Sequence, residues 1–463
     1  MTDPQKLEDT ATISPSSSTT LAHDSMRTFI ARLIALVLSV ATGIITAKWL
    51  GPAGKGVYSG TLMLVSLVMI APAGIGTAIT YELTKQRKSL SDLLPSMGVL
   101  LLWICGFAWV GAFMWALLRG WSPVLTIFVA AVPCSVVLAW QGGLYIGIGR
   151  IRNLNVQSVL LALATLVAVM LAVILFHGGA IAALAAWVVC MYGAAIVVVW
   201  HALKLGRRSI KEPLAPTMRG LVRFGGLSSV NLLLGTINYR IDSIILISIM
   251  GVASFGIYSI AVNFGELLFV LTRPITAAVT RDIGIRDAMG SALITAKVIR
   301  TCAAIAAAAS VIALVFGPWA IDTVYGTRFH DAAAPLRILV PGIVAFSTAG
   351  TFAAFFIVQA GRPLIISLIN VAMIVVQAGM CFALVPRFGM SGAALASTIT
   401  YVAGALMNTA WFCRITGVRF WDVWILRLSD VRAVRVALLA IAGSRRWRAD
   451  ARAARATTGS DGV

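Results

Sequence analysis

Five charged side chains lie inside long apolar stretches of this sequence: Arg32, Arg240, Asp242, Glu266 and Arg273. At the centre of a membrane-spanning helix each such charge costs at least ~2.5–3.5 kcal/mol, so it needs a partner, a water-filled cavity or a function. Three of the five are arginines, and the planar guanidinium group matches the oxygens of a phosphate. This small excess of basic groups favours an anionic, phosphate-bearing ligand.

Helical spacing arranges these charges into polar stripes. Residues three or four apart share a face of an α-helix, and three sets do so: Arg32, Ser39, Gly43 and Thr46; Asn231, Gly235, Asn238 and Asp242; and Ser259, Asn263, Glu266 and Arg273. Arg240 lies two residues from Asp242 and points to nearly the opposite side, so these two cannot pair on one helix.

The stripes leave two interpretations open. In the first, the charges form structural salt bridges between helices, for instance Arg240 with Glu266. In the second, they line a hydrated cavity between two halves of the protein. The cavity interpretation assigns substrate binding to Arg32, Arg240 and Arg273, and polar contacts or ion coupling to Asp242, Glu266, Asn238 and Asn263.

Other residue types that carry chemistry form no recognisable motif. The sequence has no P-loop and no H-E-x-x-H, and its four histidines are scattered. Its six cysteines lie inside apolar runs without C-x-x-C spacing, as small packing residues do. We therefore expect no catalytic residue, no metal site and no cofactor, and a protein that is not an enzyme.

The stretches that carry the charges are long enough to cross a membrane. Hydrophobic residues make up 59% of the chain and charged residues 12%, against roughly 25% charged in soluble domains, and the mean hydropathy is +0.93. A run of about 20 apolar residues spans a hydrocarbon core, where the backbone must be helical. We predict an all-α polytopic membrane protein with about twelve transmembrane helices, near 28–50, 57–80, 95–118, 124–147, 155–176, 180–203, 226–250, 256–279, 294–316, 334–358, 364–385 and 391–412.

The net charge of +20 could indicate a nucleic-acid partner, but its placement favours a membrane. Ten arginines lie from Arg414 onward, and most other basic residues lie in short loops between the predicted helices. The loops on the side of the termini carry 16 Lys and Arg, and the opposite loops carry 6, among them Lys55. The positive-inside rule then places both termini in the cytoplasm and the protein in a cytoplasmic membrane, with no nucleic acid as partner.

An internal repeat divides the chain. Leu50–Ser59 aligns with Met250–Ser259, so that Gly51, Gly56, Tyr58 and Ser59 recur 200 residues later; Gly149-Arg150 recurs as Gly361-Arg362, and 182–185 recurs as 393–396. Six predicted helices separate the copies. Two pseudo-symmetric six-helix bundles, related by an axis along the membrane normal, are an arrangement found in transporters.

The repeat and the polar segments predict five regions. They are a disordered cytoplasmic N-terminus (1–27), an N-terminal six-helix lobe (28–203), a cytoplasmic linker (204–225), a C-terminal six-helix lobe (226–415) and a basic cytoplasmic tail (416–463). The tail mixes apolar residues with arginines between 423 and 442, which is typical of an amphipathic surface helix.

Several short motifs in this order resemble a known family. They are Ala47–Tyr58 (AKWLGPAGKGVY), Asn238–Ser243 (NYRIDS), Gly256–Ser259 (GIYS), Tyr325–His330 (YGTRFH), Ala360–Pro363 (AGRP) and Val385–Ala394 (VPRFGMSGAA). With them, residues 28–415 resemble the bacterial polysaccharide-repeat (O-antigen type) flippases of the multidrug/oligosaccharidyl-lipid/polysaccharide (MOP) exporter superfamily.

The resemblance implies a MOP/MATE-like fold whose two lobes alternate between inward-open and outward-open states. The implied cargo is an undecaprenyl-pyrophosphate-linked oligosaccharide, moved to the periplasmic leaflet of a bacterial inner membrane for O-antigen, capsule or exopolysaccharide synthesis. A polysaccharide polymerase or export machinery is a candidate partner beside the bilayer. Related lipid II flippases bind pyrophosphate with cavity arginines, which by similarity singles out Arg32 and Arg273, then Arg240. The two extra C-terminal helices of those flippases have no counterpart in this sequence.

Three other interpretations stay open. A cation-coupled multidrug exporter of the same superfamily would favour an acidic cavity, whereas the excess here is basic. A membrane glycosyltransferase or ligase usually has a large outward loop, and the longest predicted one, 317–335, is short. A scaffold without transport activity would not need charges inside the membrane.

Overall fold

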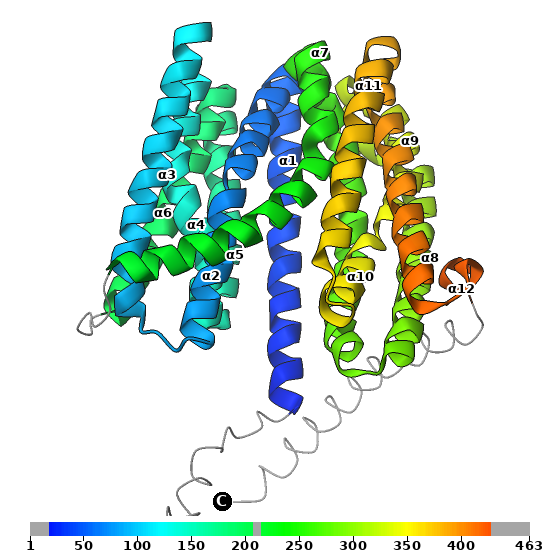
Figure 1. Cartoon of the computed structure of the whole chain (residues 1–463). Helices are drawn as coiled ribbons and strands as arrows, with labels where there is room; N and C mark the ends of the chain where they lie inside the picture. Colours follow the sequence, from blue (N-terminus) through cyan, green and yellow to red (C-terminus); the bar gives the residue numbers. More distant parts are fainter. Residues whose placement is uncertain (1–17, 207–213, 427–463) are drawn as a thin grey trace, which may run out of the picture. The chain divides into compact units, whose positions relative to one another are not determined.

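The computed structural model describes residues 18–206 and 214–426, and all regular structure in this part of the chain is helical (Figure 1). The first half contains α1 (Ser18–Val68), α2 (Ile70–Thr84), α3 (Leu90–Arg119), α4 (Pro123–Gly147), α5 (Ile151–Met170, continued as a π-helix over Leu171–Leu175) and α6 (Ala180–Leu205). The second half contains α7 (Leu214–Ile285), α8 (Ala288–Ala320), a π-helical turn (Ile321–Tyr325), a 3₁₀ turn (Thr327–Ala332), α9 (Ala333–Phe346), α10 (Ala349–Ala354), a further π-helical turn (Phe355–Gln359), α11 (Pro363–Thr416) and α12 (Phe420–Trp424).

Twelve membrane-spanning segments result from this order. The described residues form nine stretches that are long and apolar enough to cross a bilayer. Three of them, within α1, α7 and α11, each bend at a glycine with non-helical torsion angles: Gly51, Gly251 and Gly389. Each bend divides one long helix into two spans. The number of membrane-spanning segments among the described residues therefore rises from nine to twelve, and the predicted all-α polytopic fold is confirmed.

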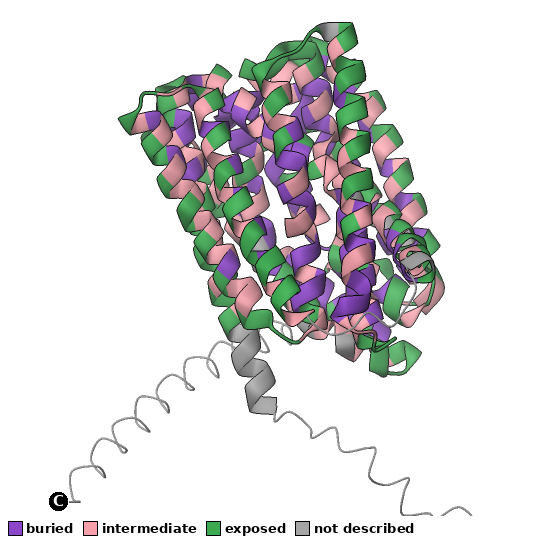
Figure 2. Cartoon of the chain, turned by 90° about the vertical axis from the view of Figure 1, so that its left-hand side faces the viewer, coloured by how far each residue is buried: buried purple, intermediate pink, exposed green. Residues whose placement is uncertain are grey.

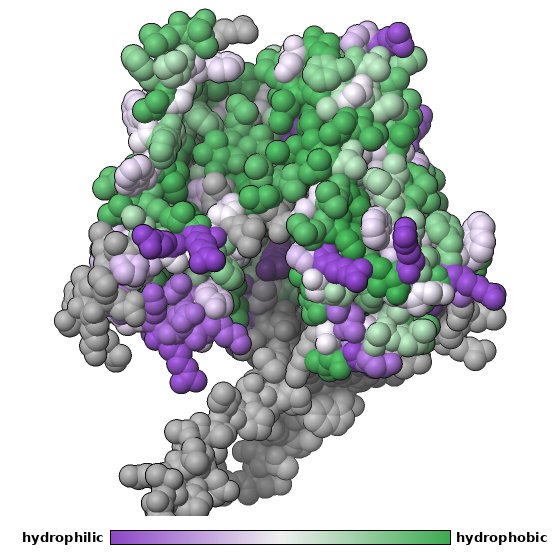
Figure 3. Space-filling model, in the orientation of Figure 1, coloured by the Kyte–Doolittle hydropathy of each residue, from purple (hydrophilic) through white to green (hydrophobic). Residues whose placement is uncertain are grey.

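The outer surface of the helices is apolar, as a lipid-facing surface must be. On α3, Leu102, Phe107 and Leu118 are 73%, 69% and 79% exposed, and such side chains would be costly in water. Exposed and buried positions alternate along the helices in Figure 2, and Figure 3 shows hydrophobic residues over most of their length with hydrophilic ones near one end. This distribution fits a multi-pass membrane protein.

The internal repeat is visible in the backbone. Four pairs of residues with positive φ lie 200 to 212 residues apart: Gly51 and Gly251 (65° and 82°), Gly120 and Gly326 (82° and 96°), Gly149 and Gly361 (71° and 62°), and His177 and Gly389 (48° and 59°). Two of these pairs belong to the sequence repeat. The other two were hidden in the sequence, because one pair lies in dissimilar surroundings and the other places a histidine where its counterpart is glycine.

The ends of several elements differ from the prediction. Helix α1 begins at Ser18, so residues 18–27 are helical and not disordered, and α7 begins at Leu214, inside the predicted linker. The predicted outward loop 317–335 is helical apart from Gly326, because α8, two short turns and α9 follow one another directly. The predicted amphipathic helix of the tail lies almost wholly outside the described residues.

Contacts divide the chain into two compact units, which are described separately. Unit 1 comprises Met1–Arg240, Met250–Ser259 and Asp322–Phe329, and unit 2 comprises Ile241–Ile249, Ile260–Ile321 and His330–Val463. In unit 1, Ile79, Leu93, Val136 and Leu221 from four helices form one buried cluster. In unit 2, the Phe412 ring makes edge contacts with Phe352 and Phe355, at centroid distances of 5.8 and 4.9 Å.

Glycine permits a close contact between helices in unit 1. A methyl group built on Gly56 would lie 1.8 Å from the carbonyl oxygen of Val252, and one on Gly256 would lie 2.0 Å from that of Pro52. Both glycines belong to the repeated motif. Their repetition in the sequence is therefore explained by direct backbone packing, which any larger side chain would prevent.

Candidate functional site

A buried carboxylate lies at the start of the α7 segment that belongs to unit 2. Asp242, on the part of α7 before its bend, is 2% exposed, and Gln377 and Ser397 on α11 are both fully buried. The Ser397 hydroxyl donates to Asp242 Oδ2 at 2.9 Å, and Gln377 Nε2 donates to the Ser397 oxygen at 3.0 Å. Asp242 Oδ1 accepts the backbone N–H of Ser243 at 2.6 Å. The bend at Gly389 separates Gln377 from Ser397 along α11.

The cluster is rich in oxygen acceptors. Within the described chain, the side-chain oxygens Gln377 Oε1 and Ser243 Oγ are buried and take part in no hydrogen bond. A buried carboxylate is stable only when it is neutralised by a proton or compensated by a nearby positive charge. Carboxylate, amide and hydroxyl oxygens are also the ligands that hard cations prefer. The arrangement can therefore hold a proton or a small hard cation.

Asp242 and Asn238 share one face of α7, as predicted. Asn238 is fully buried and Asp242 nearly so, whereas Arg240 between them is half-buried. The boundary between the two units falls within this helix, so that Asn238 and Arg240 belong to unit 1 and Asp242 to unit 2. Glu266 also belongs to unit 2, and the alternative pairing of Arg240 with Glu266 therefore stays a prediction.

The stripe on the later part of α7 does not share one environment. Ser259 is 4% exposed, Glu266 is half-buried, and Asn263 and Arg273 are exposed. The Arg273 guanidinium lies 5.7 Å from the centre of the Phe269 ring, a distance at which a cation interacts with an aromatic face.

Arg32 lies on the first span in unit 1. Its side chain is exposed, next to the exposed apolar side chains of Leu33 and Ile34. Further along the same predicted stripe the environment becomes buried, and Thr46 is 0% exposed. Arg32 and Arg273 belong to different units, so their assignment to one cavity stays a prediction.

Sequence reasoning missed Lys55, which it counted among the outward loops. Lys55 is 3% exposed and lies inside α1, beyond the bend at Gly51. Its Nζ donates to Thr46 Oγ1 at 3.1 Å and to the Gly43 carbonyl oxygen at 3.3 Å, and lies 5.8 Å from the Tyr58 ring centre. Arg300, which was counted with the loops on the side of the termini, is likewise buried inside a helix, so the orientation stays a prediction. Gln377 and Ser397 were also missed, although a lone amide inside a long apolar run is a usable signal for a buried polar contact.

Solved structures show which class of fold this is. An inward-facing multidrug resistance MATE family transporter of the MOP superfamily matches with a TM-score of 0.69 at 15% identity, over 83% of this chain and 94% of that one. Its outward-facing conformation matches at 0.63 and 16% identity, over 85% and 95%. A MOP superfamily transporter from Pyrococcus furiosus, for which reverse polarity of the binding pocket suggests a different function, matches at 0.62 and 15% identity, over 85% and 94%. The fold is therefore that of the MOP superfamily.

The family follows from the sequence match. The polysaccharide biosynthesis protein family matches residues 21–280, more than half of the chain, and the chain belongs to that family. Comparison with curated protein sequences gives no match. The resemblance predicted from the motifs is confirmed at the level of family and fold.

Proposed function

We propose that this protein is a flippase that moves undecaprenyl-pyrophosphate-linked oligosaccharide repeat units from the cytoplasmic to the periplasmic leaflet by alternating access. The observation that carries the proposal is the membership of the polysaccharide biosynthesis family in a chain with a transporter fold. A sugar headgroup cannot cross hydrocarbon unaided, because its hydroxyl groups would lose their hydrogen bonds to water. A polar path through such a fold removes that barrier.

The charges within the spans support an anionic cargo. Arg32 and Arg273 are both exposed on membrane-spanning helices, where an isolated cation is costly. We assign them, followed by Arg240, to binding of the pyrophosphate, because guanidinium groups match phosphate oxygens. In the Pyrococcus relative, pocket polarity is the feature said to suggest a different function, and the basic excess here fits the same principle.

The Asp242 cluster is the candidate for energy coupling. We propose that Asp242 binds and releases a proton or Na⁺ during the cycle, with Ser397 and Gln377 holding it in place. Asp242 is 2% exposed, and a carboxylate is less costly to bury when a proton or cation neutralises it. Ion binding therefore favours the conformation in which Asp242 is buried, which links the ion to the conformational change. Glu266 and Asn263, which are more exposed, would have a smaller effect.

Localisation follows from the same argument. We place the protein in the bacterial inner membrane with both termini in the cytoplasm, on the count of basic residues in the loops. A polysaccharide polymerase or export machinery would then receive the product on the periplasmic side.

The decisive experiment is a leaflet-transfer assay. The purified protein is reconstituted in liposomes with a short-chain undecaprenyl-pyrophosphate oligosaccharide, and its appearance in the opposite leaflet is followed for wild type, Arg32→Ala and Arg273→Ala. Arg414→Ala is a matched control, because Arg414 is likewise exposed and lies 5.9 Å from the centre of an aromatic ring, that of Trp411. We expect wild type and the control variant to transfer the glycolipid. In both test variants the transfer rate should fall at least tenfold, because loss of one phosphate contact costs ~1.4 kcal/mol, which corresponds to a factor of ten.

The outcomes separate the alternatives. Transfer that is insensitive to both substitutions would keep the flippase and refute the arginine assignment. Absence of glycolipid transfer, together with ion-driven efflux of a lipophilic cation, would establish a multidrug exporter instead.

A further inference from the structure

A groove outside the predicted substrate residues lies between α1 and the start of α5. Its volume is about 890 Å³, and its lining comes from α1 and from the chain between Gly149 and Leu160. Both walls belong to unit 1. Asn155 Nδ2 donates to Thr28 Oγ1 at 2.8 Å, which joins the two helices at the polar end of the groove.

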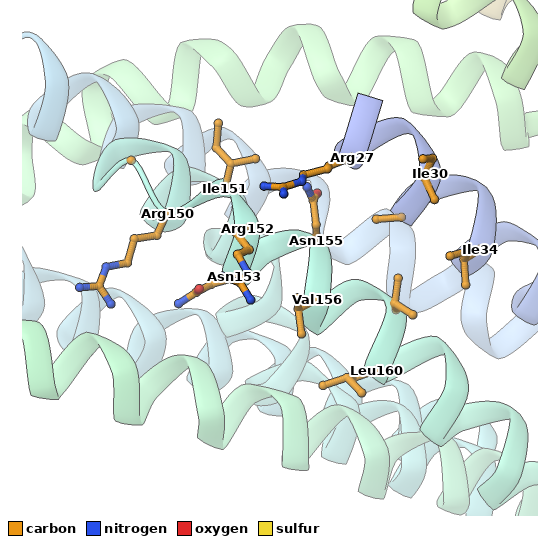
Figure 4. Close-up of a pocket in the computed structure, with 13 residues that line it drawn as sticks. Arg27, Ile30, Ile34, Arg150, Ile151, Arg152, Asn153, Asn155, Val156 and Leu160 are labelled. Carbon is orange, nitrogen blue, oxygen red and sulfur yellow. The ribbon is translucent and has the colours of Figure 1, made fainter. Parts of the chain in front are cut away.

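The polar end of the groove is basic. Arg27 from α1 and Arg150 and Arg152 from α5 line it together with two asparagines, and none of its thirteen described lining residues is acidic. Figure 4 shows Arg27 extending from α1 towards Asn155 of α5, with Arg152 nearby and the Arg150 side chain directed away from the other two arginines. Asparagine amides add neutral hydrogen-bond donors. The set is suited to an anion with several oxygen acceptors.

The start of α5 adds to the positive potential. Arg150 is the N-cap residue, its side chain makes no capping hydrogen bond, and the first turn contains no acidic residue. The N-terminus of a helix carries a partial positive charge, so basic side chains placed there are unfavourable by themselves. An anion bound at this point would offset the repulsion and accept hydrogen bonds from the first backbone N–H groups.

The other end of the groove is apolar and exposed. Ile30, Ile34, Val156 and Leu160 are 48%, 44%, 49% and 57% exposed, and Figure 4 shows them further along the helices from the basic end. A second pocket of about 600 Å³ lies between α5 and α6 and shares Arg152, Asn153, Val156 and Leu160 with the groove. A charged end continuing into an apolar channel matches an amphiphile and not a soluble anion.

The second repeat provides an internal comparison. Gly361 and Arg362 reproduce Gly149 and Arg150, including the positive φ and the uncapped N-terminal arginine. The three polar residues that follow in the first repeat, Arg152, Asn153 and Asn155, correspond 212 positions later to Leu364, Ile365 and Ser367. The turn thus occurs in both halves, whereas the arginine and two asparagines that follow it in the first half are replaced by two apolar residues and a serine in the second.

Arg32 belongs to a different face of α1. Arg27, Ile30, Ala31 and Ile34 share the face that lines the groove, and Arg32 lies about 100° beyond Ala31 around a helix with 3.6 residues per turn. The groove is therefore separate from the residues assigned to the transported pyrophosphate.

We propose that this groove binds the phosphate headgroup of an anionic bilayer phospholipid, with its acyl chains along the apolar walls of α1 and α5. Basic pockets between membrane-spanning helices recognise such headgroups, and the cytoplasmic leaflet, where the loop charges predict this end to lie, is rich in them. A lipid seated here contacts both helices and fixes the first span against α5.

Titration of the delipidated full-length protein in detergent tests this site. Phosphatidylglycerol and phosphatidylcholine are added in turn, and the melting temperature and the lipid retained in native mass spectra are measured. We expect phosphatidylglycerol to bind more tightly than phosphatidylcholine. R150Q/R152Q should weaken its binding by roughly 25-fold, since a basic residue near an anionic lipid contributes ~1 kcal/mol, or about fivefold.

Two further variants separate charge from structure. R150K/R152K should retain the preference for phosphatidylglycerol, and R362Q, at the equivalent turn of the second repeat, should bind it like wild type. The proposal is overturned if both phospholipids bind equally, if R150Q/R152Q binds normally, or if R362Q weakens binding as much. Equal stabilisation by inorganic phosphate would instead show a soluble-anion site, and binding of polyprenyl phosphate without phosphatidylglycerol would show a carrier-lipid site.

Discussion

The two repeats carry buried groups of opposite charge near their helix bends, at positions that do not correspond to each other. In the first, Lys55 is buried and its Nζ contacts the carbonyl oxygen of Gly43. In the second, 200 residues later, the counterpart of Lys55 is Phe255 and that of Thr42 is Asp242. Neither charge recurs in the other repeat: Lys55 follows the bend at Gly51, whereas Asp242 precedes the bend at Gly251.

The partners of the two groups suggest different tasks. Lys55 donates to the Gly43 carbonyl oxygen and to Thr46 Oγ1, and the Thr46 hydroxyl in turn donates to the carbonyl oxygens of Thr42 and Gly43. Asp242 belongs to a chain of buried groups that ends in Gln377 Oε1, which has no hydrogen-bond partner among the described residues. Lys55 thus donates to oxygens of its own helix, whereas the Asp242 cluster contains an acceptor without a hydrogen-bond partner among the described residues, which leaves capacity for an ion. The bend that recurs in the two halves is therefore flanked by a cation with protein partners in one half and by a carboxylate cluster with a spare acceptor in the other.

Reversing the charge at Lys55 should have the largest effect. Lys55→Glu would direct a carboxylate at the Gly43 carbonyl oxygen, and an uncompensated buried charge costs about 3–5 kcal/mol. We expect little folded protein, measured as the monodisperse fraction after purification. Lys55→Met, which keeps the length without the charge, should fold with a melting temperature near that of wild type. A well-folded Lys55→Glu variant would show that the site is open to water and that the comparison fails.

Removing the charge of Asp242 should affect transport more than folding. Asp242→Asn is nearly isosteric and can still accept the Ser397 hydroxyl, so the melting temperature should change by only a few degrees. Transport driven by an ion gradient should fall at least tenfold, equivalent to ~1.4 kcal/mol of lost coupling. Asp287→Asn is the matched control, because Asp287 is an exposed N-cap of α8 and asparagine caps equally well. Unchanged gradient-driven transport by Asp242→Asn would remove Asp242 from the coupling proposal.

Loss of the hydroxyl at Ser397 should have a moderate effect on stability. Ser397→Ala removes the 2.9 Å hydrogen bond to Asp242 and leaves Gln377 Nε2 without its acceptor. Hydrogen bonds to charged groups contribute about 1.5–3 kcal/mol, and less if Asp242 is protonated. The loss, measured by thermal unfolding in detergent, should therefore be greater at high pH than at low pH if Asp242 is ionised there. A pH-independent loss would indicate that Asp242 stays in one protonation state throughout.

Much of the fold could be predicted from the sequence because the membrane imposes strong constraints. Apolar runs of spanning length predicted twelve spans, and the predicted breaks after residues 50, 250 and 385 contain the three bends at Gly51, Gly251 and Gly389. Continuation of the helix through these breaks was not predicted, because glycine, proline and basic residues are also typical of loops. Continuation of helix through 317–335 was missed because polar residues at helix ends resemble loop residues in composition.

The candidate sites were less predictable, since contacts between helices distant in sequence leave little local signal. The stripe placed Asn238 and Asp242 on one helix face, and both are buried, whereas their assignment to a cavity stays a prediction. Its partners on α11 could not be assigned, because Gln377 and Ser397 lie in apolar runs more than a hundred residues away. Lys55 was misplaced because a Gly-Pro-Ala-Gly-Lys-Gly sequence is typical of a loop, whereas the structure places this stretch inside α1, with Gly56 packed against Val252.

The smallest expected effect concerns Gln377. Gln377→Met replaces a buried amide whose oxygen has no hydrogen-bond partner among the described residues. The variant loses the hydrogen bond to Ser397 but no longer buries an unpaired oxygen, so the two contributions to the free energy of unfolding should cancel to within about 1 kcal/mol. If the amide only supports Ser397, the Q377M/S397A double variant should be less destabilised than the sum of the single variants, because no donor is then left unpaired. If Gln377 Oε1 instead binds the coupling ion, Gln377→Met should leave the melting temperature unchanged and raise the ion concentration needed for half-maximal transport several-fold. A change in ion dependence without a change in stability would therefore distinguish an ion ligand from a packing residue, and would sharpen the contrast with the self-contained contacts of Lys55.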